Sequence, residues 1–184
     1  MKLILVRHGQ TKENKRGIIM GQNPGELSEE GIASSKKLAA ALKSKDIDFV
    51  VSSDLKRCVD TARILLSGRD IELVTEARLR EVNFGEYQGK PYMAITGDYT
   101  SDLDKKFPSG ESNREFIIRV TGCINDVYAK HENETVLVVG HSGTISIILG
   151  AYKGVTFEKA IRELKLHNAS EVIIEMSSKL TYLI

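Results

Sequence analysis

The sequence predicts an α/β fold, a three-layer sandwich in which helices cover both faces of a mostly parallel central sheet. Short apolar runs alternate with amphipathic segments along the chain, as strand and helix units in series require. Most of these runs are continuously apolar, which is typical of strands that are covered on both faces. The 184 residues are enough for one such core. We therefore expect a single domain spanning 1–184.

The N-terminal part of the chain predicts the first strand and the first helix. Residues 3–6 are continuously apolar and predict a buried strand, and a loop rich in glycine and asparagine covers 9–26. A helix is predicted from Ser28 to about Ser44. The Ser28 hydroxyl can cap its first turn, and the two glutamates that follow suit the positive end of the helix dipole.

The second strand and helix come next, followed by a segment without clear periodicity. Residues 49–52 predict a buried strand, and apolar residues spaced three and four apart predict a helix after it, capped by Ser53 or Asp54. Residues 71–74 predict a short third strand. The segment 76–110 holds two of the three prolines and several glycines, so we expect a cap-like excursion over one end of the sheet.

A long helix and another buried strand follow this excursion. Ser112 and Glu115 have the spacing of a capping box, and the apolar residues after them recur with helical periodicity. Residues 135–139 form the most apolar predicted strand of the chain. An apolar helix is expected after it, from about Thr144 to Tyr152.

The C-terminal part predicts one helix and two strands. Thr156 is placed to cap a helix that runs through Leu164. Residues 171–176 and 180–183 are rich in β-branched and apolar side chains and are separated by a short polar turn. We expect them to form an antiparallel hairpin at an edge of the sheet.

Composition excludes several classes of protein. The chain is 41% hydrophobic and 28% charged, so we expect neither a disordered nor a membrane protein. Its formal net charge of +1 argues against a general nucleic-acid-binding protein, which usually carries a clustered excess of Lys and Arg. Cys58 and Cys123 lack the spacing of a metal or redox site, so we expect core thiols. No secretory signal is apparent, and we expect a cytoplasmic protein.

Cationic side chains follow three of the predicted strands. Arg7 and His8 come directly after the first strand, Arg57 follows the second, and His141 follows the strand at 135–139. The carboxyl ends of parallel strands share one edge of a sheet, where ligands of α/β proteins collect. Cations that lie close together in a crevice repel one another, which is electrostatically unfavourable unless an anion balances their charge. A phosphoryl group fits best, because guanidinium groups bind its oxygens in pairs.

Six blocks of the sequence, together with Asn14 and Arg57, resemble the histidine phosphatase superfamily, which has the phosphoglycerate mutase-like fold. The RHG tripeptide alone is a weak signal, whereas the ordered set of blocks is specific. The blocks are LVRHGQT at 5–11, LS at 27–28, SSDL at 52–55, LREVNFG at 79–85, PSGES at 108–112 and VVGHSG at 138–143.

The resemblance implies a role for each cationic residue at the strand ends. His8 is expected to be the nucleophile, which attacks phosphorus and forms a phosphohistidine. Surrounding positive charge should keep its imidazole neutral, as the attack requires. Arg7, Arg57 and His141 are expected to hold the equatorial phosphoryl oxygens, and Asn14 should add a neutral donor.

The resemblance also assigns the acid and the remaining contacts with substrate. Glu81 is expected to protonate the leaving oxygen and then to activate the water that hydrolyses the phosphohistidine. Further contacts with substrate are expected from Thr11, Gln10, Gly21 and Ser142. Relatives often carry Glu at the position of Gln10, and this difference bears on substrate fit rather than on mechanism.

These residues together predict a phosphomonoesterase that acts on a small phosphorylated metabolite without a metal ion or another cofactor. Its compact layout is similar to α-ribazole and small sugar-phosphate phosphatases. We expect no nucleic-acid or membrane partner, and a homodimer is compatible with the sequence.

Three alternatives stay open at this point. A cofactor-dependent phosphoglycerate mutase would carry a longer, arginine-rich insertion after the acid, whereas 90–107 contains no arginine. A serine hydrolase using Ser142 would need glycine at position 144, where the chain has Thr144. A phosphate-binding module without turnover would not need both His8 and Glu81.

Overall fold

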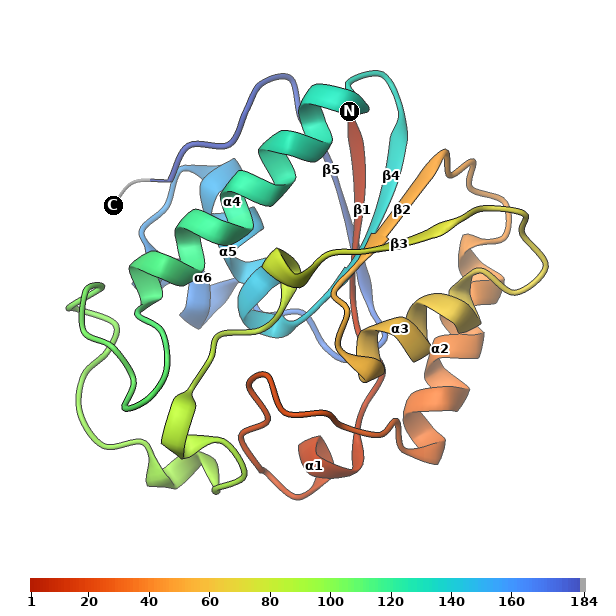
Figure 1. Ribbon diagram of the computed structural model, residues 1–184. Helices are drawn as coiled ribbons and strands as arrows, with labels where there is room; N and C mark the ends of the chain where they lie inside the picture. Colours follow the sequence, from red (N-terminus) through yellow and green to blue (C-terminus); the bar gives the residue numbers. More distant parts are fainter. Residues whose placement is uncertain (183–184) are drawn as a thin grey trace.

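The computed structural model describes residues 1–182, and its centre is a five-stranded mixed sheet (Figure 1). The strand order is β3-β2-β4-β1-β5, and four strands are mutually parallel while β5 runs antiparallel to β1. This is the mostly parallel sheet that the sequence predicts. The strands are β1 (Lys2–Arg7), β2 (Phe49–Ser52), β3 (Leu73–Thr75), β4 (Thr135–Gly140) and β5 (Glu171–Glu175).

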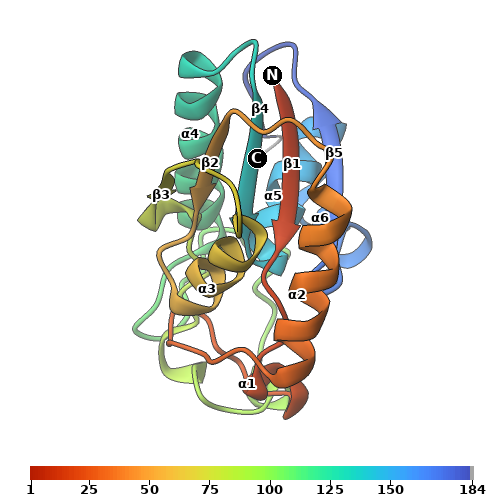
Figure 2. The same cartoon turned by 90° about the vertical axis from the view of Figure 1, so that its right-hand side faces the viewer.

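Helices cover both faces of the sheet, as expected. One face carries α2 (Glu29–Leu42) and α3 (Lys56–Leu65), which lie in front of the sheet in Figure 2. The other face carries α4 (Asn113–Lys130), α5 (Ser142–Lys153) and α6 (Phe157–Glu163). The fold is therefore a three-layer α/β sandwich.

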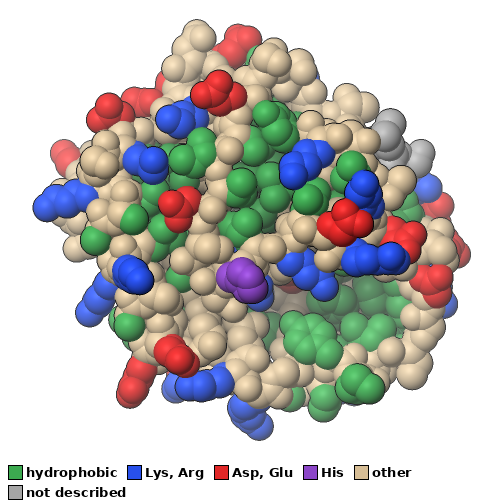
Figure 3. Space-filling view, turned by 180° about the vertical axis from the view of Figure 1, so that it is seen from behind, with side chains coloured by type: hydrophobic (Ala, Val, Ile, Leu, Met, Phe, Trp, Pro, Cys, Tyr) green, Lys and Arg blue, Asp and Glu red, His purple; other side chains and the backbone are tan. Residues whose placement is uncertain are grey.

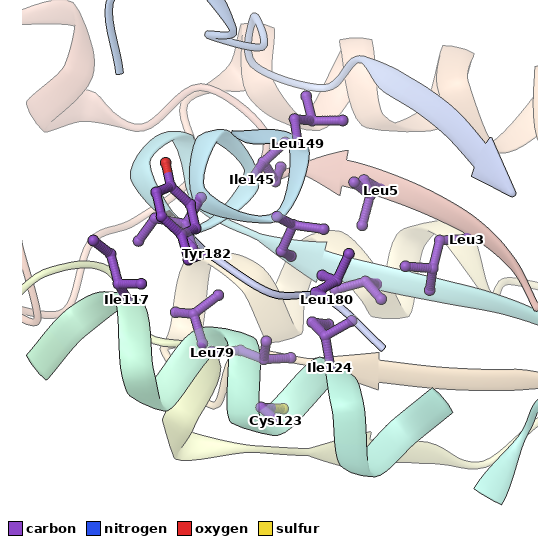
Figure 4. Packing of buried hydrophobic residues seen from close by; sticks show 14 of the residues in the cluster. Leu3, Leu5, Leu79, Ile117, Cys123, Ile124, Ile145, Leu149, Leu180 and Tyr182 are labelled. Carbon is purple, nitrogen blue, oxygen red and sulfur yellow. The ribbon is translucent and has the colours of Figure 1, made fainter. Parts of the chain in front are cut away.

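Alternation along the strands builds a separate core on each face. In β1, Leu3 and Leu5 pack against α4 and α5, and Ile4 and Val6 pack against α2 and α3. All four side chains are fully buried. Successive side chains of a strand point to opposite faces, so a strand covered on both sides must be apolar throughout. Figure 4 shows the larger core, with Leu3 and Leu5 facing the helices.

Three of the predicted helix caps are present in the structure. The Ser28 hydroxyl accepts a hydrogen bond from the Gly31 N–H at 3.0 Å and opens α2. Ser112 and Glu115 form the predicted capping box of α4, and Thr156 caps α6. These caps satisfy N–H groups that the first helical turn leaves without partners.

The predicted cap of α3 is wrong. The N-cap residue is Leu55, which makes no side-chain cap hydrogen bond. The Ser53 hydroxyl is instead 2.9 Å from Nε2 of His141, and the Asp54 carboxylate accepts a hydrogen bond from Nε of Arg80 at 2.7 Å. Both polar side chains are used in tertiary contacts that sequence spacing does not reveal.

The predicted C-terminal hairpin is also wrong. β5 pairs with β1 as an edge strand, but residues 180–182 form no strand, and residue 183 lies outside the described part of the chain. Leu180 and Tyr182 are buried against α4 and α5 (Figure 4), and the Leu180 N–H donates to Oδ1 of Asn125 at 2.7 Å. Their alternating apolar pattern is satisfied by packing rather than by strand pairing.

The loops at the carboxyl ends of the strands contain short helices. The loop 9–26 holds the one-turn helix α1 (Lys12–Lys15), and the excursion 76–110 holds three 3₁₀ turns. Both segments lie at the foot of the sheet in Figure 1, where the parallel strands end. None of the helices in residues 1–182 combines the length and the apolarity needed to cross a membrane.

Candidate active site

A cavity of about 470 Å³ opens at the carboxyl ends of the parallel strands. Eight of the ten residues that the sequence assigns to the site line this cavity. Gln10 and Thr11 do not. The eight are Arg7, His8, Asn14, Gly21, Arg57, Glu81, His141 and Ser142.

His8 is held in the cavity as a neutral ring with one fixed proton. Its side chain is 2% exposed, and its Nδ1 lies 2.8 Å from the carbonyl oxygen of Gly9. A carbonyl only accepts, so Nδ1 carries the proton and Nε2 carries the lone pair of the neutral ring. Burial lowers the pKa of His8 well below its ordinary value, and the charges of Arg57 and Arg7 lower it further. His8 is therefore chemically ready to act as a nucleophile.

Arg7 lines the cavity beside His8 and has a hydrogen-bond donor that is not used within the described residues. Its Nη1 donates to the carbonyl oxygen of Leu166 at 2.7 Å, which orients the guanidinium. Its Nε is buried and has no hydrogen-bond partner among the described residues. A buried donor without a partner is costly, so a ligand oxygen at this point would satisfy it.

Arg57 is 1% exposed and pairs with no carboxylate among residues 1–182. Its Nη1 donates to the Asn23 carbonyl at 2.8 Å, and its Nη2 donates to the Gly21 carbonyl at 2.7 Å. Backbone carbonyls fix the guanidinium without neutralising it. A buried positive charge held in this way favours an anion in the cavity.

His141 lies between Arg57 and Ser53. Its Nδ1 faces Nε and Nη2 of Arg57 at 3.3 and 3.1 Å, so Nδ1 is an acceptor and Nε2 carries the proton. Nε2 then donates to the Ser53 hydroxyl at 2.9 Å. Burial lowers the pKa of His141 well below its ordinary value, followed by the effects of Arg57 and His8. The rings of His141 and His8 meet edge to face, with 5.3 Å between their centroids.

Glu81 reaches the cavity from the excursion and docks on the first turn of α5. Its Oε2 accepts from the Gly143 N–H at 3.0 Å, and its Oε1 accepts from the Val82 N–H at 3.0 Å. A Cβ at position 143 would overlap Oε1 of Glu81, so this approach requires glycine. The start of α5 therefore faces the carboxyl group of Glu81. The neighbouring Arg80 forms its ion pair with Asp54 rather than with Glu81.

Arg119 supports Glu81 from α4, a role that the sequence does not reveal. Its Nη2 donates to the Glu81 carbonyl at 2.9 Å, and its Nη1 donates to the carbonyl oxygens of Arg78 and Arg80 at 2.8 and 2.7 Å. Nε of the same guanidinium donates to Oε2 of Glu111 at 2.9 Å. These bonds fix the backbone that carries the carboxylate. No local pattern links an arginine in the middle of a helix to a loop 38 residues before it.

The α1 turn directs the Asn14 amide toward the cavity. Oδ1 of Asn14 accepts from the Thr11 N–H at 3.2 Å, and the Thr11 hydroxyl accepts from the Asn14 N–H at 3.0 Å. With Oδ1 engaged, Nδ2 remains as a donor on a residue that lines the cavity. Thr11 is thus the cap of α1, and Oε1 of Gln10 accepts from the Ser28 hydroxyl at 2.9 Å. Substrate contacts by Gln10 and Thr11 stay a prediction.

The opposite side of the cavity is mostly apolar. Figure 3 views the molecule from behind and shows a hollow at the lower right with hydrophobic side chains on its floor. This is the side of the excursion, which lies at the lower left of Figure 1. Lys165 also lines the cavity, and no pattern in the sequence indicates a role for it. The apolar lining residues include Val82, Phe84, Tyr92, Ile95, Tyr99, Phe107, Phe116, Phe157 and Ile161.

Within residues 1–182, no group of three or more His, Cys, Asp or Glu side chains is arranged to hold a metal ion. Cys58 and Cys123 are both buried and unpaired with each other. Burial raises the pKa of the Cys58 thiol to about 12 and likewise that of Cys123, so both thiols are protonated. Both behave as the core thiols that the sequence predicts.

Comparison with known proteins places this geometry in a family. Residues 3–183 match the family described as the histidine phosphatase superfamily, branch 1. The chain is 32% identical over 157 residues to the adenosylcobalamin/alpha-ribazole phosphatase of Salmonella typhimurium, which covers 81% of this chain and 78% of that protein. It is 31% identical to phosphoserine phosphatase 1 of Hydrogenobacter thermophilus, with 97% and 88% of the two chains covered.

A solved structure of similar architecture supports the same relationship. The crystal structure of the alpha-ribazole phosphatase from Shigella flexneri superposes with a TM-score of 0.87 at 26% sequence identity. The superposition covers 100% of this chain and 95% of that one. Sequence and fold thus agree over nearly the whole length of both proteins.

Proposed function

The chain belongs to the histidine phosphatase superfamily, and we propose that it hydrolyses small phosphomonoesters through a phosphohistidine on His8. The observation that carries the proposal is the state of His8 and its surroundings. His8 is buried and neutral with its lone pair on Nε2, beside two guanidinium groups that pair with no carboxylate among the described residues. Such a site combines a nitrogen nucleophile with fixed positive charge for a phosphoryl group.

In the first step, Nε2 of His8 attacks the phosphorus atom. The N–P bond forms while the bond from phosphorus to the substrate oxygen breaks. Arg7 and Arg57 stabilise the negative charge on the equatorial oxygens, and Asn14 adds a neutral donor. A contact of His141 with an equatorial oxygen stays a prediction, because its Nε2 proton is donated to the Ser53 hydroxyl in this structure. Protonated Glu81 gives its proton to the leaving oxygen, so the alcohol departs as a neutral molecule.

In the second step, water attacks the phosphohistidine. The Glu81 carboxylate takes a proton from the water as the new O–P bond forms and the N–P bond breaks. Inorganic phosphate leaves, and His8 returns to its neutral form while Glu81 is again protonated. The Gly143 N–H and the Arg119 guanidinium keep Glu81 in one place through both steps. No step of the proposal uses a metal ion.

The cavity supports a substrate of metabolite size. A volume of about 470 Å³ holds a phosphoryl group and a modest leaving group, and pockets of this size commonly bind small molecules. The two named relatives are phosphatases of small phosphorylated compounds. We extend that substrate class to this chain.

The excursion favours a phosphatase over a mutase. Each of its three lysines has another partner: Lys105 lies over the Tyr99 ring, Lys90 lies over the Tyr87 ring, and Lys106 pairs with Glu115. None of these lysines lines the cavity in the described residues. A mutase must retain a charged intermediate long enough to rephosphorylate it, and the stretch 90–107 places no cation in the lining of the cavity.

The serine hydrolase alternative lacks a base. Ser142 lines the cavity, but neither histidine of the site hydrogen-bonds to its hydroxyl among residues 1–182. Nδ1 of His8 faces a carbonyl, and both nitrogens of His141 are engaged by Arg57 and Ser53. A serine without a hydrogen-bonded base is a weak nucleophile.

A hydrolysis screen tests the proposed function. Purified protein in EDTA should release phosphate from p-nitrophenyl phosphate and from members of a panel containing phosphoserine, α-ribazole phosphate, sugar phosphates and 3-phosphoglycerate. The His8→Ala variant, checked for folding by thermal melting, serves as the blank. Conversion of 3-phosphoglycerate to 2-phosphoglycerate without phosphate release would favour the mutase. Binding of phosphate without any turnover would favour a binding module.

A further inference from the structure

The segment 166–170 holds the end of β1 from outside the sheet. The Ala169 N–H donates to the carbonyl oxygens of Arg7 and His8 at 3.1 and 3.2 Å, and the Arg7 N–H donates to the Ser170 carbonyl at 3.2 Å. The Leu166 carbonyl accepts from the Arg7 side chain. This segment therefore contacts both residues that the site requires at the end of β1, although it lies about 160 residues away in the sequence.

Asn168 is the side chain of this segment that reaches the site. Its Nδ2 donates to the His8 carbonyl at 3.0 Å and to Oδ1 of Asn14 at 3.3 Å. The orientation of both amides follows from their partners. The Thr11 N–H can only donate, so it selects Oδ1 of Asn14, and the His8 carbonyl can only accept, so it selects Nδ2 of Asn168.

The backbone around Asn168 is in an uncommon conformation. Ala169 has a φ of 49°, in the left-handed region that residues other than glycine rarely adopt. The Ala169 N–H bonds to Arg7 and His8 accompany this conformation. Local strain of this kind persists where surrounding contacts hold it, and such positions cluster at functional sites.

We propose that Asn168 is a positioning residue, whose amide keeps the Asn14 donor turned into the cavity and fixes the backbone of His8. The proposal rests on the proposed function, because Asn14 and His8 act on the phosphoryl group there. Without the Asn168 donor, Oδ1 of Asn14 loses one of its two partners and the amide can rotate. The Asn14 donor is then no longer preplaced for a phosphoryl oxygen.

Three single variants separate positioning from packing. Asn168→Ala removes the donor, and Asn168→Asp keeps the shape but turns an acceptor toward two acceptor oxygens. His167→Gln is the matched control, because that side chain is exposed on the same segment and makes no hydrogen bond with the site among residues 1–182. With p-nitrophenyl phosphate at neutral pH, we expect kcat/KM to fall about tenfold to a hundredfold in Asn168→Ala and further in Asn168→Asp. The control should match the wild type.

The pH dependence of kcat/KM distinguishes positioning from packing, because a side chain that only fills space would not make activity depend on the protonation of residue 168. The kcat/KM ratio of Asn168→Asp to wild type should rise as pH falls, because a protonated carboxyl regains a donor. A double variant adds a second test: in an Asn14→Ala background, Asn168→Ala should cost less than it does alone. An Asn168→Asp variant more active than Asn168→Ala, with a flat pH ratio, would overturn the proposal, and so would fully multiplicative losses.

Binding of inorganic phosphate separates failure of this inference from failure of the proposed function. If the wild type hydrolyses nothing on the panel, the proposed function fails, but calorimetry with phosphate still reads the Asn14 contact. Weaker phosphate binding in Asn168→Ala than in His167→Gln would then support the positioning role. Equal binding in the two folded variants would contradict it.

Discussion

His8 shows how the surroundings of one residue decide its chemistry. An exposed histidine is partly protonated near neutral pH and has no fixed tautomer. Here burial and two arginines hold the ring neutral, and the Gly9 carbonyl places the proton on Nδ1. The sequence predicts the charges around His8, because Arg7 and Arg57 follow strands. It does not predict the tautomer, which depends on the local path of the backbone.

Gly143 is the residue whose size decides where Glu81 lies. Gly143→Ala should push the carboxylate out of its place on the first turn of α5, because a Cβ there overlaps Oε1 of Glu81. We expect kcat to fall about a hundredfold with a smaller change in KM, since proton transfer is lost while phosphate contacts remain. Steady-state kinetics with a phosphomonoester that has a poor leaving group measures this directly.

Gly122→Ala is the matched control for this substitution. Gly122 lies within α4, and apart from its chain neighbours and the backbone of its own helix no atom of residues 1–182 lies within 4 Å of the position that its Cβ would occupy. The variant should keep full activity and gain about 0.5–1 kcal/mol of stability, because alanine favours a helix over glycine. An equal loss of kcat in both variants would contradict the role assigned to Gly143.

At the scale of elements, the strands are the part that the sequence predicts best. Continuous apolar runs indicate buried strands, and their carboxyl ends share one edge of the sheet because the strands are parallel. For this reason the sequence alone predicts that Arg7, His8, Arg57 and His141 share one crevice. Ser28, Ser112 and Thr156 could be identified as caps for a similar reason, since a cap acts within its own helical turn.

Contacts between distant elements are what the sequence could not predict. Ser53 has the residue type and position of a helix cap, but its hydroxyl serves His141 from another strand end. Leu180 and Tyr182 follow the alternating apolar pattern of a strand, but they pack in the core beside α4 instead of pairing with another strand. Arg119 and Asn168 support the site from α4 and the 166–170 segment. Each of these roles depends on tertiary geometry, which local patterns do not encode.

At the scale of the whole molecule, the two buried histidines couple stability to pH. His8 and His141 both have a pKa well below the ordinary value of 6.5 in the folded protein. Above that value, neither the folded nor the unfolded chain binds protons at these rings. Below it, the unfolded chain takes up protons that the folded protein refuses, so stability is lost as pH falls. The loss is about 1.4 kcal/mol per pH unit for each histidine.

Urea unfolding of the wild type and of His141→Asn checks this coupling. Between about pH 6.5 and about pH 5.5, the free energy of unfolding should fall by about 1 kcal/mol less in the variant, because the unfolded histidine is only half protonated at the upper end of this range. Other groups titrate in the same way in both proteins, so the difference between the two slopes isolates the histidine. Parallel slopes would show that His141 accepts a proton in the folded state.

The cavity also belongs to the molecule as a whole. The strand ends provide the charged side, whereas the excursion and α6 provide most of the apolar side. The charged side determines the reaction, and the apolar side determines which leaving group fits. A small set of sequence blocks could therefore indicate the chemistry, while the substrate depends on side chains spread over several elements.

Trapping of the covalent intermediate tests the central claim most directly. A phosphomonoester labelled with ³²P would be mixed with the enzyme and quenched in alkali during turnover, and the labelled peptide would be sequenced. We predict label on the peptide that contains His8, stable in alkali and lost in acid, and none in His8→Ala. Label on Ser142 that survives acid, or rapid phosphate release with no label on the wild type, would contradict a phosphohistidine mechanism.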